Sequence, residues 1–204
     1  VDMRALNGEA LWQYVRSQYH TATDFINLNN GGVSPQALPV QQLHQQLLQQ
    51  SNKGPTFYMW REVDGQRELL RQTLAAMMGC ATDELAINRN TTEGLNTIIA
   101  GLPLKKGDEV VLTRYDYPNM LNAWKQRATR DGIVLKWVDL TLPVEDVDSV
   151  VTAFAKAITP ATRIVHVTHM INWTGQLLPV KEIAETAHAK SCEVLVDGAH
   201  TFAH

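Results

Sequence analysis

The stretch Glu193-Val194-Leu195-Val196-Asp197-Gly198-Ala199-His200 decides how the rest of the chain is interpreted. Its three consecutive apolar residues, 194–196, predict a short strand that is buried on both faces, as in a parallel sheet. In open α/β sheets, ligands bind just beyond the carboxyl ends of the strands, which is where Asp197 and His200 fall. A plain strand followed by a turn would place Asp197 and Gly198 in the same positions, so the remaining sequence has to decide between the two interpretations.

Size and composition are those of an ordinary globular protein. The chain has 204 residues, of which 45% are hydrophobic and 19% are charged, enough for one large core or for one domain and part of another. A net charge of −3 without a long basic run argues against a nucleic-acid partner, and no apolar run is long enough to cross a bilayer. Two cysteines, Cys80 and Cys192, are too few for a disulfide framework, so the compartment stays open between cytoplasm and, if a signal was removed, periplasm.

From residue 85 onward, strand and helix patterns alternate along the chain. The expected strands are 85–88, 109–112, 133–138, 163–167 and 194–196, and the expected helices are 93–100, 119–130, 147–158 and 180–190. This alternation is typical of βαβ units and predicts an α/β fold, with a mostly parallel sheet and flanking helices.

The first part of the chain has a different pattern. Helices are expected over 7–19, 41–50 and 67–78, the last of them ended by Gly79. We expect two parts: an N-terminal helical segment, 1–60, with a substrate or interface loop, and a large α/β domain, 61–204.

An aromatic cluster, Phe57-Tyr58-Met59-Trp60, stands at this boundary next to Arg61. Its composition favours either a buried core or an interface between subunits over a substrate wall.

The segment after residue 88 has the features of a phosphate site. A Gly-rich dinucleotide turn and a Walker loop are both absent from the sequence. Instead, the hydroxyls of Thr91 and Thr92 stand at the start of an expected helix, where free backbone N–H groups and a partial positive charge favour an anion. The simpler alternative is that Asn90 or Thr91 only caps the helix.

Four segments together resemble the class V family of pyridoxal-phosphate (PLP) enzymes, which includes cysteine desulfurases, kynureninase and isopenicillin N epimerase. The matching segments are Thr91-Thr92-Glu93-Gly94-Leu95-Asn96, Thr168-His169-Met170-Ile171-Asn172 with Gly175, Asp197-Gly198-Ala199-His200, and the opening Leu28-Asn29-Asn30-Gly31-Gly32-Val33-Ser34-Pro35. The last of these is most similar to the isopenicillin-epimerase-like branch. Their order and span make the resemblance specific, and it implies the large domain of the aspartate-aminotransferase-like fold.

The resemblance gives these positions roles toward a PLP cofactor. It implies that Asp197 pairs with the pyridine nitrogen, while Thr91 and Thr92 hold the phosphate. It further implies that Asn172 bonds the phenolic oxygen of the ring and that His200 lies near the same edge. Substrate contacts are expected from the glycine-rich opening segment, at Asn30 and Gly31.

The residue that stacks on the ring is left between two tyrosines. The segment Tyr115-Asp116-Tyr117-Pro118 follows the 109–112 strand, where the family has a histidine or an aromatic residue. Comparison with kynureninase favours Tyr117, whereas comparison with the desulfurase histidine favours Tyr115 or Asp116, and an aspartate cannot stack.

A metal site is the competing interpretation of the histidines. Asp197, His200 and His204 could cluster on a helix, with His166 and His169 near them in sequence. Residues three apart on a strand point to opposite faces, however, and no cysteine completes a ligand set, so we expect no metal.

The resemblance also implies what lies elsewhere. The Schiff-base lysine of the family would fall beyond His204, so we expect these residues to be the N-terminal half of a homodimeric enzyme that acts on an amino acid or amine-bearing metabolite. Epimerase, lyase or aminotransferase chemistry is favoured, with cysteine desulfuration and a non-catalytic binding domain as alternatives.

Overall fold

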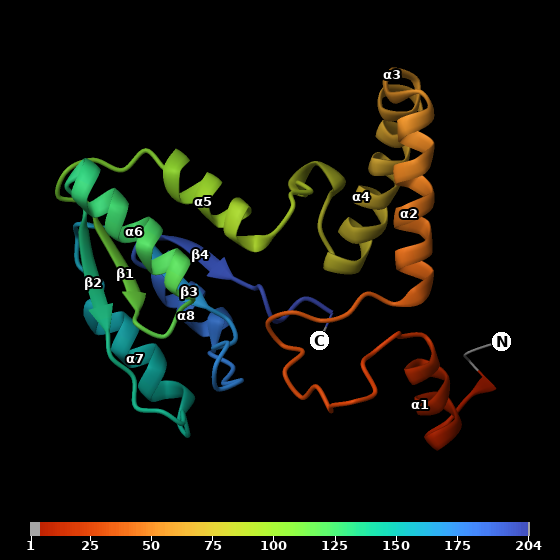
Figure 1. The fold of residues 1–204 in the computed structure, drawn as a ribbon. Helices are drawn as coiled ribbons and strands as arrows, with labels where there is room; N and C mark the ends of the chain where they lie inside the picture. Colours follow the sequence, from red (N-terminus) through yellow and green to blue (C-terminus); the bar gives the residue numbers. More distant parts are fainter. Residues whose placement is uncertain (1–4, 204) are drawn as a thin grey trace. The chain divides into compact units, whose positions relative to one another are not determined.

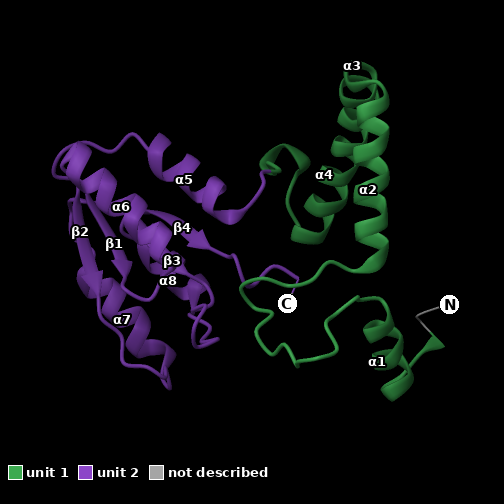
Figure 2. Ribbon diagram, viewed as in Figure 1, with its two compact units in different colours: residues 1–87 green, residues 88–204 purple. Residues whose placement is uncertain are grey.

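The computed structural model describes residues 5–203 and divides the chain into two compact units, 1–87 and 88–204 (Figures 1 and 2). The expected boundary at residue 60 differs from this division, because it falls inside a π-helix, η2 (Tyr58–Val63). That helix runs directly into α4 (Asp64–Met78) and also contacts α2 (Leu38–Lys53), so it belongs to the first unit.

The first unit is helical. Besides α2, η2 and α4 it contains α1 (Gly8–Ser17), the short α3 (Pro55–Phe57) and a 3-10 turn, η3 (Thr82–Glu84). The three expected helices are confirmed, and Gly79 ends α4 with a φ of 70°, a conformation that glycine adopts without steric cost. Within residues 5–203 no helix has the length and apolar character needed to cross a membrane.

The aromatic cluster at 57–61 is helical but not buried. Phe57, Met59 and Trp60 are 56%, 52% and 71% exposed. The core alternative is therefore wrong for this chain, and the interface alternative remains.

The second unit is a four-stranded parallel sheet flanked by helices, which confirms the expected fold class (Figure 1). The strands β1 (Glu109–Thr113), β2 (Val134–Val138), β3 (Thr162–Thr168) and β4 (Glu193–Asp197) lie in the order β2-β1-β3-β4. They are joined by α6 (Pro118–Asp131), α7 (Val147–Ala157) and α8 (Val180–His188), and α5 (Thr91–Gly101) precedes them. In the ladder between β3 and β4, Thr168 is opposite Asp197, so both stand at the carboxyl edge.

Each face of the sheet has its own hydrophobic core. Val111, Val165 and Val167 pack with residues of α7 and α8 on one face. On the other face, Leu112 and Ile164 pack with residues of α5 and α6, including the fully buried Trp124. Alternation along each strand thus assigns the even-numbered residues of β3 to the α5–α6 face.

Two details of the expected sheet are wrong. Residues 85–88 form no strand, because among the described residues no ladder includes them, and an extended segment is a strand only when a neighbour pairs with its backbone. The apolar run in β4 is not buried on both faces either, because β4 lies at an edge of this sheet and Val196 is 38% exposed.

Candidate functional site

The direction of α5 brings its N-terminus to the carboxyl edge of the sheet. Helix α6 follows β1 and runs back along the sheet, so Arg127, near its end, lies toward the amino edge of the strands. There the guanidinium donates to the carbonyl oxygens of Ile99, Ala100 and Leu102 at the end of α5. The opposite end of α5 is about 16 Å away at 1.5 Å per residue, roughly the length of a five-residue strand. Its N-terminus therefore lies at the same edge as Asp197.

The N-terminus of α5 has its cap and its free donors in place. Asn90 is the N-cap, with its Oδ1 accepting from the Glu93 N–H at 2.9 Å. The N–H groups of Thr91 and Thr92 precede the first possible intrahelical acceptor, so they have no partner within the helix. Of the two residues named as possible caps, Asn90 is the one that caps the helix, and capping leaves the N–H groups of Thr91 and Thr92 free for an anion.

At position 94 of this motif, a residue larger than glycine would have to displace the end of the Asn88 side chain. A Cβ atom there would come within 2.5 Å of the Asn88 side-chain nitrogen. The Glu93 carboxylate turns away to Arg89, whose hydrogen bonds hold the pKa of Glu93 below its ordinary value. The acidic residue of the motif is thus bound to Arg89, beside the free N–H groups of Thr91 and Thr92.

Asp197 is a buried carboxylate at the end of β4. It is 5% exposed, and its Oδ1 accepts from the Ala199 N–H at 3.0 Å. Burial is the main cause that raises its pKa, the charge of Asp116 raises it further, and the Ala199 N–H and His166 act in the opposite sense. A cationic partner beside this carboxylate would offset the cost of its burial.

Beside Asp197 lies a buried pair that the sequence did not single out as a site. Asp116 Oδ2 contacts His166 Nε2, and both side chains are almost fully buried, at 2% and 1% exposed. Asp116 precedes α6 and His166 lies in β3, so the pair joins two neighbouring strand ends. A histidine within the otherwise apolar run Ile164-Val165-His166-Val167 is the signal that could have revealed it.

The two candidate stacking tyrosines have different surroundings. The Tyr115 hydroxyl donates to the Leu140 carbonyl oxygen at 2.8 Å, and its ring lies 6.0 Å from the Trp173 ring. Tyr117 is the N-cap residue of α6 and is 45% exposed. The ring of Tyr115 is therefore committed to packing within the unit, and that of Tyr117 is accessible.

The loop after β3 carries Asn172 and is fixed to the end of β4. The His169 N–H donates to the Asp197 carbonyl oxygen at 2.9 Å, and the Leu178 N–H donates to the His169 carbonyl oxygen at 2.9 Å. Asn172 lies exposed in the turn of this loop, whereas Gly175 has a φ of 73°. His200 is half-buried in the turn after β4, so Asn172 and His200 both belong to segments that start at the carboxyl edge.

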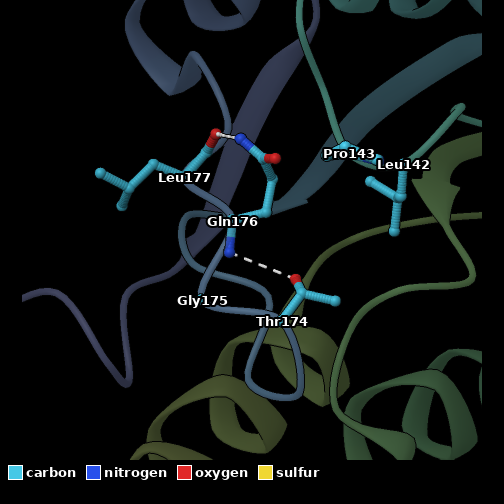
Figure 3. Close-up of a pocket in the computed structure, with 6 residues that line it drawn as sticks. All are labelled: Leu142, Pro143, Thr174, Gly175, Gln176 and Leu177. Carbon is cyan, nitrogen blue, oxygen red and sulfur yellow. Dashed lines mark hydrogen bonds between the residues drawn. The ribbon is translucent and has the colours of Figure 1, made fainter.

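The hollow beside this loop is separate from these residues. It has a volume of about 610 Å³ and is lined by Leu142, Pro143, Thr174, Gly175, Gln176 and Leu177 (Figure 3). Gln176 braces its wall, donating through Nε2 to the Leu177 carbonyl oxygen and through N to Thr174 Oγ1. None of the predicted cofactor contacts lines it, so its size alone does not make it the site.

The predicted substrate residues lie in the helical unit. Asn30 is held by Asn27, whose Nδ2 donates to Asn30 Oδ1 at 3.0 Å, and it lines a cavity of about 550 Å³ that also includes Arg16 and His20. Gly31 is exposed, and a Cβ atom added to it would have no other atom within 4 Å. Their role toward a substrate stays a prediction.

The histidines do not gather as metal ligands in the described residues. No group of three or more His, Cys, Asp or Glu side chains among residues 5–203 is arranged around a common point. His166 contacts Asp116 instead, and His204 lies outside the described residues.

A family model for class-V aminotransferases matches residues 26–204. The chain belongs to this family. Membership indicates PLP as the cofactor, as the sequence motifs predicted. Among curated relatives, isopenicillin N epimerase of Streptomyces clavuligerus is 28% identical over 93% of this chain and 48% of its own length. A probable cysteine desulfurase of Halalkalibacterium halodurans is 34% identical over 69% of this chain and 34% of its own length.

Solved structures give the same result for the fold. A mutant of C-DES with glycine covalently linked to its PLP cofactor has a TM-score of 0.80 at 26% identity, covering 91% of this chain and 50% of that one. The cystine C–S lyase C-DES with its product cysteine persulfide has a TM-score of 0.73 at 27% identity, covering 84% of this chain and 46% of that one. The chain thus spans about half the length of the first of these relatives and of both structures.

Proposed function

We propose that this chain forms the cofactor-binding half of a PLP-dependent enzyme that acts on an amino acid or an amine-bearing metabolite. The observation that carries the proposal is the common edge of the sheet. The buried carboxylate of Asp197 lies at this edge, and the bonds of Arg127 to the far end of α5 support placing Thr91 and Thr92 at the same edge. The helix N-terminus offers N–H donors to a phosphate, and the Asp197 carboxylate offers an anion to a protonated ring nitrogen.

The charge state of Asp197 fits this ligand. Burial raises its pKa because the ionised carboxylate loses solvation. A cation bound beside it would offset that cost and keep the carboxylate ionised. When bound, PLP supplies an electron sink for the bond-breaking steps at the substrate, and Asp197 would keep the ring nitrogen protonated.

The remaining contacts can be assigned from the same edge. Tyr117 is our choice for the ring that stacks on the cofactor, because its ring is accessible while the Tyr115 hydroxyl is bonded to Leu140. Asn172 would bond the phenolic oxygen, and His200 would lie beside it.

Among reaction types, we favour epimerase, lyase or aminotransferase chemistry over desulfuration. The segment Tyr115-Asp116-Tyr117 has no histidine, although a stacking histidine that transfers protons is what the desulfurase branch would have there. Cysteine desulfuration remains the second candidate because a relative with that name is 34% identical.

The lysine that carries the cofactor is proposed to lie outside these 204 residues. Lys181 is in α8, and Lys190 lies three residues before β4, toward the edge of the sheet opposite to Asp197. The Lys190 Nζ donates to the Ala155 carbonyl oxygen at 2.5 Å. The half of the relatives that this chain does not cover would supply the anchor.

A homodimer is also part of the proposal. The exposed apolar side chains of Phe57, Met59 and Trp60 lie within about one helical turn, next to Arg61, a composition typical of interface hot spots. We propose that this cluster contacts a second subunit.

The test is PLP binding by the complete natural polypeptide, measured by equilibrium dialysis. We expect Asp197→Ala to weaken binding about a hundred-fold, the effect of removing one partner of a buried ion pair. Asp148→Ala, at an exposed site in the first turn of α7, is the matched control and should bind normally. Borohydride reduction followed by peptide mapping then locates the anchoring lysine. Failure of the unsubstituted protein to bind PLP would refute the proposed function, and stoichiometric trapping on Lys181 or Lys190 would refute the position of the anchor.

A further inference from the structure

The buried Asp116–His166 pair has no part in the function proposed so far. His166 is 1% exposed, and its Nδ1 is buried without a hydrogen-bond partner among the described residues. The contact between its Nε2 and Asp116 Oδ2 is therefore the polar contact that holds the ring. The Trp124 ring lies edge-on to the His166 ring at a centroid distance of 6.0 Å.

Asp116 carries this contact on to the backbone of Tyr117. While Oδ2 meets His166, Oδ1 accepts from the Tyr117 N–H at 2.6 Å. Tyr117 has no side-chain capping bond and has an extended backbone, with φ −59° and ψ 133°, immediately before the first turn of α6. Its backbone direction is thus fixed by a carboxylate that is itself fixed by His166.

We propose that His166 is a positioning residue, which acts through Asp116 to hold the Tyr117 ring in the place where it stacks on the cofactor. The inference rests on the proposed function and on Tyr117 as the stacking residue. The steps are all on one face of the sheet: β3 supplies His166, the end of β1 leads to Asp116, and Tyr117 opens α6.

The chemistry of the pair suits a positioning role. A carboxylate that accepts from a backbone N–H on one oxygen and from a ring N–H on the other has both oxygens directed, so it cannot rotate without losing a bond. Both partners are buried, and losing one leaves the other without compensation for its desolvation. Packing alone does not fix the orientation of Tyr117 as firmly as these hydrogen bonds do, because Tyr117 is 45% exposed.

The experiment is a double-mutant cycle on PLP affinity, measured with the complete natural polypeptide by equilibrium dialysis. We expect Tyr117→Ala and His166→Leu each to weaken PLP binding about ten-fold, the size of a lost aromatic contact. Combined, they should weaken it no more than Tyr117→Ala alone, because His166 acts through Tyr117. His166→Gln should restore near-normal binding, since its amide N–H reaches about as far as Nε2.

Several results would overturn the inference. One is that His166→Leu weakens PLP binding equally in the presence and in the absence of the Tyr117 side chain, which indicates a structural role only. Another is that Tyr117→Ala leaves the PLP affinity unchanged. If circular dichroism shows that His166→Leu does not fold, Asp116→Leu takes its place in the same cycle with the same expectation. Absence of PLP binding by the unsubstituted protein would remove the proposed function and the inference together, whereas normal binding with additive effects would remove the inference alone.

Discussion

The two units of this chain differ in how they bury their apolar residues. The sheet unit has a core on each face of its sheet, with Trp124, Phe154 and Val165 fully inaccessible. In the described part of the helical unit, Ala75 is the buried hydrophobic residue, while Trp12, Leu69 and other large apolar side chains are more than half exposed. Amphipathic helices gain most of their stability by covering one face against a partner. The sheet unit therefore contains its own source of stability, and the helical unit does not.

The largest effect is expected when the two units are separated. We expect a polypeptide of residues 88–204 to unfold in one cooperative transition, and a polypeptide of residues 1–87 to lose its helical signal gradually. Far-UV circular dichroism during urea titration measures both. A sharp cooperative transition in the 1–87 polypeptide would contradict the comparison.

A pair of core and surface substitutions tests the same difference inside the intact chain. Trp124→Ala in the sheet unit should lower the free energy of unfolding by about 3–5 kcal/mol, because it leaves a large cavity. Leu69→Ala in the helical unit should change it by less than about 0.5 kcal/mol, since Leu69 is 64% exposed. Urea denaturation gives both values, and equal effects would show that Leu69 is covered in solution.

Asp197 is the exception within the stable unit, because its burial costs free energy there. Its folded-state pKa is raised, so its contribution to stability is present in acid and is lost as the pH rises through that pKa. Without PLP, Asp197→Asn should therefore have a higher melting temperature than the unsubstituted protein at pH 7, and the difference should shrink toward pH 4. PLP affinity should fall about a hundred-fold at the same time. Thermal unfolding between pH 4 and 8 tests this. A lower melting temperature for Asp197→Asn than for the unsubstituted protein at pH 7 would show that burial of the Asp197 carboxylate does not destabilise the fold.

The smallest expected effect concerns the exposed residues of the helical unit. Trp60→Ala should weaken self-association about five-fold if the 57–61 cluster is the subunit contact, corresponding to about 1 kcal/mol. Trp12→Ala, in α1 and 66% exposed, is the control and should leave association unchanged. Sedimentation equilibrium measures both, and an unchanged profile for Trp60→Ala would exclude this cluster.

The sheet unit could be predicted well from sequence because its signals are local. Apolar periodicity located the four strands found among residues 5–203 and the helices between them, and Asn90 was recognisable as a possible cap from its residue type. The strand expected at 85–88 shows the limit of such signals. Its composition suits a strand, but pairing depends on a neighbour that composition does not reveal.

The site was predictable only where its residues form contiguous motifs. Asp197 and Thr92 lie in such motifs, whereas Asp116 and His166 are 50 residues apart and meet only in the folded sheet. From the sequence, Asp116 is only a side chain that cannot stack, and His166 is only a candidate metal ligand. Burial and long-range contact define their role, and neither is a property of local sequence.

That separation of 50 residues has a consequence for the order in which the chain folds. The contact between Asp116 and His166 closes a loop that includes α6, β2 and α7, so its entropy cost is met only after those elements are ordered. Every ladder of the sheet is parallel and needs such a long crossover, which makes the folding of this unit slow compared with a helical bundle. Formation of the Asp116–His166 contact would therefore be a late event in the folding of this unit.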